Sequence, residues 1–92
     1  MTTADRPTTA DIEVVLRATL APLSIAVQDD SHRHAGHAGA REGGHYSVVL
    51  VSARFTGLGR VARHRLVYHA LAGLMLRGIH ALAIDARAPD EG

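Results

Sequence analysis

The stretch "RLVYHALAGLMLRGIHALAIDA", from Arg65 to Ala86, changes its hydrophobic period half-way along. Its first half belongs to a helical segment over about residues 60–76, with one apolar stripe made of Val67, Ala70, Leu71, Leu74 and Met75. Gly78 follows, and glycine readily takes the left-handed conformation that ends a helix. From Ile79 the pattern alternates, which is the period of a strand. The stretch therefore predicts a helix that crosses over into a strand.

Two more strands and a helix are expected before this stretch. From His45 a run of apolar residues, including Val48 and Val49, fills both faces of a strand, which is typical of an inner strand. Earlier, Leu23, Ile25 and Val27 alternate with smaller or polar residues and predict a half-buried strand.

A first helix is expected over residues 10–20, because Ile12, Val15, Leu16 and Leu20 recur at helical spacing. Thr8 or Thr9 can cap its start, and Pro22 ends it because proline lacks the backbone donor that a helix needs.

The resulting order is α-β-β-α-β. A long hairpin loop, ending near Gly44, joins the first two strands, and a right-handed helical crossover makes the third strand parallel to the second. We therefore expect an α/β (α+β) fold with a three-stranded mixed sheet covered by helices on one face. The 92 residues are 47% hydrophobic, which suits one domain over residues 1–92, with residues 1–8 as a flexible tail.

The amino-acid composition argues against several classes of function. Ten basic residues, all arginine, nearly balance nine acidic residues, and the formal net charge of +1 gives no strong attraction to nucleic acid or anionic lipid. Cysteine is absent, and no apolar run approaches the length of a membrane span. The start "MTTADRPTT" lacks the apolar segment of a secretion signal, so a cytoplasmic location is predicted.

Five fragments carry a resemblance to a known family: "DDSHRHAGH", "HYSVVLVSARFTGL", "RHRLVYHAL", "IHALAI" and "ARAP". In order and spacing they resemble the BolA family, from about Ile12 to Pro89. The resemblance implies a KH-like fold of the second topological type. It also implies a heterodimer with a monothiol glutaredoxin that shares a [2Fe-2S] cluster, in iron–sulfur trafficking and iron homeostasis. Some family members are instead described as DNA-binding transcriptional regulators.

The chain can supply only part of such a cluster site. Iron–sulfur clusters are normally held by thiolates, although imidazole can replace thiolate on one iron. Without cysteine, this chain offers only nitrogen ligands, and the sulfur must come from the glutaredoxin and its glutathione. No cofactor is expected on the protein alone.

The resemblance places the C-terminal ligand on His80 and the second ligand in the loop between the first two strands, most naturally on His34, with His32 and His37 as alternates. From the residues alone, these loop histidines are equally compatible with adventitious zinc or copper binding, or with a solvated loop. The alternation puts His80 on the strand face of Leu82 and Ile84, where a half-buried histidine bonded to backbone is the alternative.

The "RHR" group at the start of the second helix is a candidate for contact with a partner or an anion. Arg63 and His64 fall at the two margins of the apolar stripe and Arg65 faces outward. Because cations are unfavourable at a helix start, a carboxylate is expected nearby, from glutathione, from glutaredoxin or from Asp85. A structural salt bridge is the alternative.

A nucleic-acid binder is the other function class that stays open, with Arg54, Arg60, Arg63 and Arg65 on phosphates. The sequence favours the cluster partner, because "FTGLGR" lacks the G-x-x-G turn of KH-type RNA binders and the net charge is small. No enzyme is predicted, because the chain lacks a cysteine nucleophile, a phosphate-binding loop and carboxylates paired in a pocket-forming context.

Overall fold

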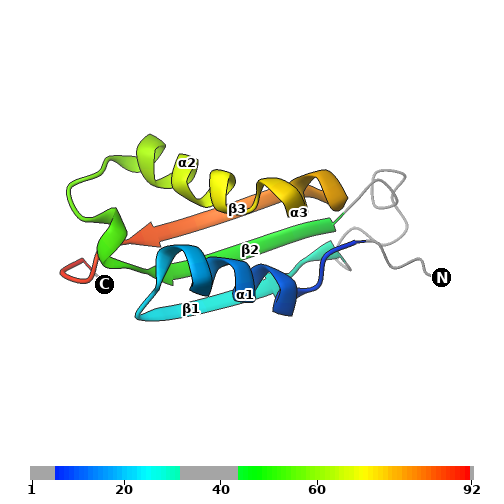
Figure 1. Cartoon of the computed structure of the whole chain (residues 1–92), viewed down its shortest axis with the longest axis horizontal. Coiled ribbons are helices and arrows are strands. Elements are labelled where there is room, and N and C mark those ends of the chain that lie inside the picture. The colour runs from blue at the N-terminus through cyan, green and yellow to red at the C-terminus, as the bar shows by residue number, and fades with distance from the viewer. Residues whose placement is uncertain (1–5, 32–43, 92) are drawn as a thin grey trace.

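The computed structural model describes residues 6–31 and 44–91, which form a three-stranded sheet with helices on one face (Figure 1). The elements follow in the order α1 (Thr9–Leu20), β1 (Ser24–Asp29), β2 (Gly44–Val51), the 3-10 helix η3 (Ala53–Phe55), α2 (Arg60–Ala70), α3 (Ala72–Arg77) and β3 (Ile79–Arg87). The predicted order of helices and strands is confirmed, except that η3 was not expected and the second helix is divided.

The sheet has the strand order β1-β2-β3, with β1 antiparallel and β3 parallel to β2. The predicted central position of the second strand is therefore confirmed. Tyr46, Val48 and Leu50 point toward the helices and are buried, whereas Val49 on the opposite face is 46% exposed. The helices thus cover one face of the sheet, as expected, and leave the other face open.

One core joins the covered face to the helices. It comprises Ile12, Leu16, Leu20, Tyr46, Val48, Leu50, Phe55, Val67, Leu71, Leu74, Ile79 and Ala88. The residues from α1 lie four apart in sequence, which places them on one side of the helix. No helix within residues 6–31 and 44–91 is long and apolar enough to cross a membrane.

The start of α1 is closed by a capping box. The Thr8 hydroxyl accepts from the Asp11 N–H at 3.0 Å, and the Asp11 carboxylate accepts from the Thr8 N–H at 2.9 Å. The hydrogen bond from the Thr8 backbone is the main reason that the pKa of Asp11 lies below its usual value. Pro7 is buried, and the Tyr46 hydroxyl donates to its carbonyl. Pro7 and Thr8, which the sequence assigns to a flexible tail over residues 1–8, are thus in contact with the folded domain, and residues 1–5 lie outside the described part.

The single helix predicted over residues 60–76 is wrong, because Leu71 separates α2 from α3 with φ −97° and ψ 9°. Gly73 follows two residues later and has a low helix propensity, which weakens the helix at this point. The Leu71 N–H still donates to the Val67 carbonyl at 3.0 Å, and the Met75 N–H donates to the Leu71 carbonyl at 2.8 Å. Leu71 and Leu74 both reach the core across the break.

The start of β3 is irregular. Gly44 of β2 lies opposite Ile79, but His45 lies opposite Ala81, so one extra residue, His80, bulges between them. The prediction that His80 shares a face with Leu82 in regular alternation is wrong for this reason. Ile79 is buried instead, and His80 is exposed.

Candidate functional site

His80 lies beside a second histidine at the N-terminal end of β3. The ring centres of His45 and His80 are 5.3 Å apart, with the rings tilted by 49°. A metal bound through one ring nitrogen lies roughly 3.2 Å from the ring centre, so two imidazoles on one tetrahedral ion have ring centres about 5.2 Å apart. The observed separation therefore fits two imidazoles on one ion. We call His45, His80 and Ser31, whose hydroxyl accepts from the His45 N–H, the histidine end.

The backbone at the histidine end is tied together by hydrogen bonds. The His45 N–H donates to the Ser31 hydroxyl at 3.0 Å, and the Ser31 N–H donates to the Asp29 carboxylate at 2.8 Å. The Asp30 N–H donates to the His45 carbonyl at 2.6 Å. These bonds hold the end of β1 against the start of β2, and so fix the position from which the His45 side chain emerges.

Ser31 and Gly44, the described residues on either side of the stretch 32–43, both lie at the histidine end. Gly44 donates its N–H to the Gly78 carbonyl at 2.7 Å. The predicted ligand His34 and its alternates His32 and His37 lie outside the described residues.

A hollow of about 440 Å³ lies next to the histidine pair. The Ser47 hydroxyl, in its wall, donates to the Asp30 carboxylate. The hollow is lined by Asp30, His45, Tyr46, Ser47, Ala81, Leu82 and Ala83. Within the described residues, no group of three or more His, Cys, Asp or Glu side chains is arranged to hold a metal ion. This part of the chain therefore offers a pair of imidazoles and not a complete site.

His45 is the candidate residue that the sequence does not single out, because there it is only the first residue of the second predicted strand. Its contact with His80 depends on the register between β2 and β3 and on the bulge at His80. The one available signal is that both histidines lie within the first two residues of strands that are expected to run parallel. Parallel neighbours begin at the same edge of a sheet.

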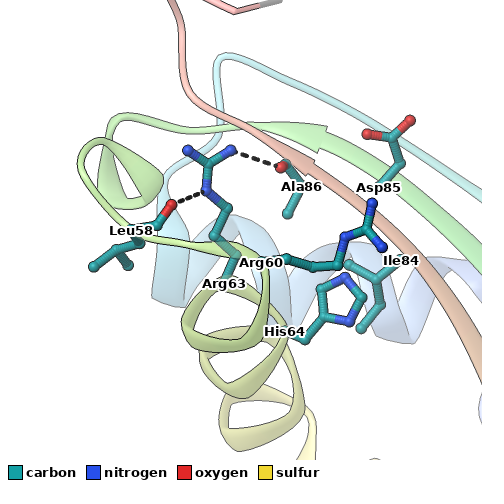
Figure 2. Close-up of a pocket in the computed structure, with 7 residues that line it drawn as sticks. All are labelled: Leu58, Arg60, Arg63, His64, Ile84, Asp85 and Ala86. Atoms are coloured by element: carbon teal, nitrogen blue, oxygen red, sulfur yellow. Dashed lines mark hydrogen bonds between the residues drawn. The ribbon is translucent and has the colours of Figure 1, made fainter.

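A second candidate site lies at the other end of β3, where a groove of about 660 Å³ separates this strand from the start of α2 (Figure 2). We call it the arginine groove. It is lined by Leu58, Arg60, Arg63, His64, Ile84, Asp85 and Ala86.

Arg63 is held firmly in the wall of the arginine groove. Its Nε donates to the Leu58 carbonyl at 2.7 Å, and its Nη1 donates to the Ala86 carbonyl at 3.1 Å (Figure 2). The same guanidinium binds both carboxylate oxygens of Glu91, at 2.5 and 2.7 Å. These bonds lower the pKa of Glu91 to about 2, with a further contribution from the Ala88 N–H. Arg63 is therefore in a structural salt bridge with Glu91, the alternative named above, whereas Asp85 pairs with Arg87 at 2.9 Å.

The other candidate binding residues lie in different parts of the structure. His64 lines the groove with Arg60, whose guanidinium extends between the His64 ring and Asp85 in Figure 2. Arg65 is exposed and is not part of the lining. Arg54 lies in η3, where its Nη1 donates to the Thr19 carbonyl at 3.4 Å. The structure therefore brings Arg60, Arg63 and His64 together and separates Arg54 and Arg65 from them.

Comparison with known proteins agrees with this architecture. The family model described as BolA-like protein matches residues 16–91. The chain is 41% identical over 80 residues to Protein BOLA1, chloroplastic, of Arabidopsis thaliana, which covers 83% of this chain and 50% of that protein. It is 45% identical over 73 residues to the DNA-binding transcriptional regulator BolA of Escherichia coli (strain K12), covering 79% of this chain and 68% of the relative. The chain thus spans half the length of its chloroplastic relative.

Comparison with a solved structure also finds a BolA domain. The BolA domain of SufE1 from Arabidopsis thaliana superimposes with a TM-score of 0.80 at 39% identity, covering 91% of this chain and 94% of that one. Neither the family model nor the names of these relatives indicates an enzyme class. Because both its sequence and its three-stranded mixed sheet with helices on one face match these proteins, the chain belongs to the BolA-like protein family.

Proposed function

We propose that this protein is a non-enzymatic partner of a monothiol glutaredoxin, with which it forms a heterodimer and shares a [2Fe-2S] cluster through histidine ligands. The proposed role lies in iron–sulfur cluster assembly or trafficking and in iron homeostasis. Membership in the BolA-like family supports the proposal. The observation that carries it is the pair of imidazoles at the histidine end, with ring centres 5.3 Å apart.

The position of His80 suits a ligand that meets a partner. The bulge turns His80 out of the regular pairing, and its side chain is exposed. An exposed imidazole at the end of a sheet can reach a cluster carried on another protein, whereas a histidine inside the core cannot. The hydrogen-bonded backbone of Ser31 and His45 gives this end a defined geometry.

The donor atoms fit half of a cluster and no more. A chain without cysteine can provide one iron with two nitrogen ligands, as in Rieske centres, and the other iron needs thiolates from elsewhere. When bound, the cluster would supply an iron site or an electron, and this chain would supply imidazole ligands. The thiolates would come from the glutaredoxin and its glutathione.

Two residues compete for the place of second ligand. His45 is adjacent to His80. His34 is the position that the family resemblance favours, and both flanks of its loop are anchored at the histidine end. Separate substitutions of these two histidines distinguish the possibilities.

The test is to mix the protein with a cluster-loaded monothiol glutaredoxin and to record visible absorption and circular dichroism. The wild type is expected to change both spectra in a one-to-one complex. His80→Ala should abolish the change, and only one of His45→Ala and His34→Ala should alter the cluster spectrum strongly. His69→Ala, an exposed histidine on α2, is the matched control and should behave as wild type.

Isotope labelling tests directly whether histidines of this chain bind the cluster. If only this chain carries ¹⁵N-histidine, a pulsed electron paramagnetic resonance spectrum of the reduced complex should show ¹⁵N coupling to the cluster. The proposal fails if no such coupling is found, or if His80→Ala leaves the spectra of the complex unchanged.

DNA binding is the second candidate, because one relative is named a DNA-binding transcriptional regulator. Arg54, Arg60 and Arg65 are exposed and would be available to phosphates, whereas Arg63 is engaged by Glu91. Duplex binding measured at two salt concentrations tests this function. Replacing Arg60 by Ala should lower the salt dependence by about one counterion if this residue contacts a phosphate.

A further inference from the structure

The outer edge of β3 is open, because β3 pairs only with β2 and has no strand on its other side in the described part of the chain. The arginine groove follows this edge, with α2 as its opposite wall (Figure 2). It lies at the other end of the sheet from the histidine end (Figure 1). Its occupant is therefore a separate question from the cluster.

The direction of the backbone groups along this edge can be deduced. The Ser52 N–H donates to the Arg87 carbonyl at 2.9 Å, so that carbonyl points toward β2. Carbonyl directions alternate along a strand, so those of Ala86, Ile84 and Leu82 point outward. Two of these outward carbonyls accept hydrogen bonds from side chains outside the sheet, which agrees with this direction. Arg63 donates to the Ala86 carbonyl, and the Tyr68 hydroxyl donates to the Leu82 carbonyl at 3.5 Å.

Ile84 is the residue left between these two contacts. Its N–H and C=O both point outward into the groove that Ile84 helps to line. No hydrogen bond from outside the sheet reaches either group within the described residues. One outward donor and one outward acceptor on the same residue is the pattern that an added strand recognises.

The charged side chains around Ile84 define the chemistry of the occupant. Arg63 is already paired with Glu91, and Asp85 is paired with Arg87. Arg60 makes no ion pair among the described residues, and it lies beside His64 in the groove (Figure 2). The groove therefore offers one uncompensated cation next to an open strand edge. The chain's own Glu91 also demonstrates that a carboxylate suits this wall.

We propose that the arginine groove binds an extended acidic peptide segment of another protein, which pairs with Ile84 at the edge of β3 and places a carboxylate against Arg60. Leu58 and Ala86 provide apolar surface for the alternate side chains of such a strand. A nucleic-acid backbone matches the groove less well, because phosphates offer acceptors only and Asp85 and Glu91 flank the site.

The test uses a labelled, end-capped hexapeptide of alternating valine and glutamate, with binding followed by fluorescence anisotropy at low salt. Arg60→Gln should weaken binding about tenfold, which is the typical effect of losing one charge-assisted hydrogen bond. Arg60 is exposed at the first position of α2, so this change leaves the core intact. Arg77→Gln, an exposed arginine in α3 outside the groove, is the matched control and should bind as wild type.

Further probes test main-chain pairing and the charge of the occupant separately. The same peptide with alternate amides N-methylated should not bind, because it cannot pair with Ile84, and a valine–lysine peptide should not bind either. With the acidic peptide, the amide resonance of Ile84 should shift in a ¹H–¹⁵N spectrum. Absence of peptide binding, no effect of Arg60→Gln, unchanged binding after N-methylation, or tighter binding of a short thymidine oligonucleotide would each overturn the proposal.

Discussion

Gly44 illustrates how one residue secures the histidine end. A Cβ atom built on Gly44 would collide with the ring and hydroxyl of Tyr46, a buried residue whose hydroxyl donates to the Pro7 carbonyl. The close approach of backbone to ring therefore requires glycine at the point where β2 begins.

Gly44→Ala is expected to lower the free energy of unfolding by about 1–3 kcal/mol, the usual cost of overpacking a well-packed site. Gly73→Ala is the matched control, because no atom lies within 4 Å of its added Cβ and the residue is helical. It should raise stability by roughly 0.5 kcal/mol through helix propensity. Urea unfolding measures both, and equal effects of the two changes would contradict the assigned contact.

The pair formed by Arg63 and Glu91 predicts a titration. Because the pKa of Glu91 is lowered to about 2 from 4.5, the pair stabilises the fold above pH 4.5, and this contribution is lost as the pH falls through about 2. In Arg63→Gln the Glu91 carboxyl should titrate much closer to 4.5. Carboxyl ¹³C chemical shifts followed against pH check this, and an unchanged midpoint near 2 in the variant would mean that Arg63 is not the cause.

At the scale of the element, the boundaries of α1 follow from local chemistry. The sequence predicts Thr8 or Thr9 as the capping residue, and the structure has Thr8 in that place with a full capping box. The division between α2 and α3 was not predicted, because the apolar stripe continues through Leu71 and gives no sign of a change in backbone direction there. Periodicity reports which side chains are buried, but it is insensitive to a break of one residue.

Thr8→Ala should destabilise the protein by about 1 kcal/mol, because it leaves an N–H at the start of α1 without its side-chain acceptor. Thr9→Ala changes the neighbouring residue, which lies inside the helix and makes no capping bond. Thermal unfolding of the two variants provides the comparison. A loss as large in Thr9→Ala as in Thr8→Ala would show that the cap is not the source of the effect.

At the scale of the whole molecule, the two candidate sites lie toward opposite ends of β3, with His80 at its second residue and the groove residues Ile84, Asp85 and Ala86 in its second half. Sites that share no contacts are expected to behave additively. His80→Ala should therefore abolish the spectral change with cluster-loaded glutaredoxin and leave acidic-peptide binding intact.

Arg60→Gln should have the opposite pattern, and the double variant should lose both properties. Measuring both assays on all three variants tests this independence. Loss of peptide binding in His80→Ala would contradict it and would indicate that the two ends of the sheet are coupled.

The sequence by itself determined the order of the elements, the central place of the second strand and the parallel crossover, because periodicity and chain connectivity are local properties. It also determined that this chain supplies no cysteine thiolate. Only the tertiary structure decided that His45 meets His80 and that Glu91 is the carboxylate bound to Arg63. These contacts join residues far apart in sequence, and they depend on strand register, one bulge and the path of the C-terminal segment, none of which leaves a periodic signal in the sequence.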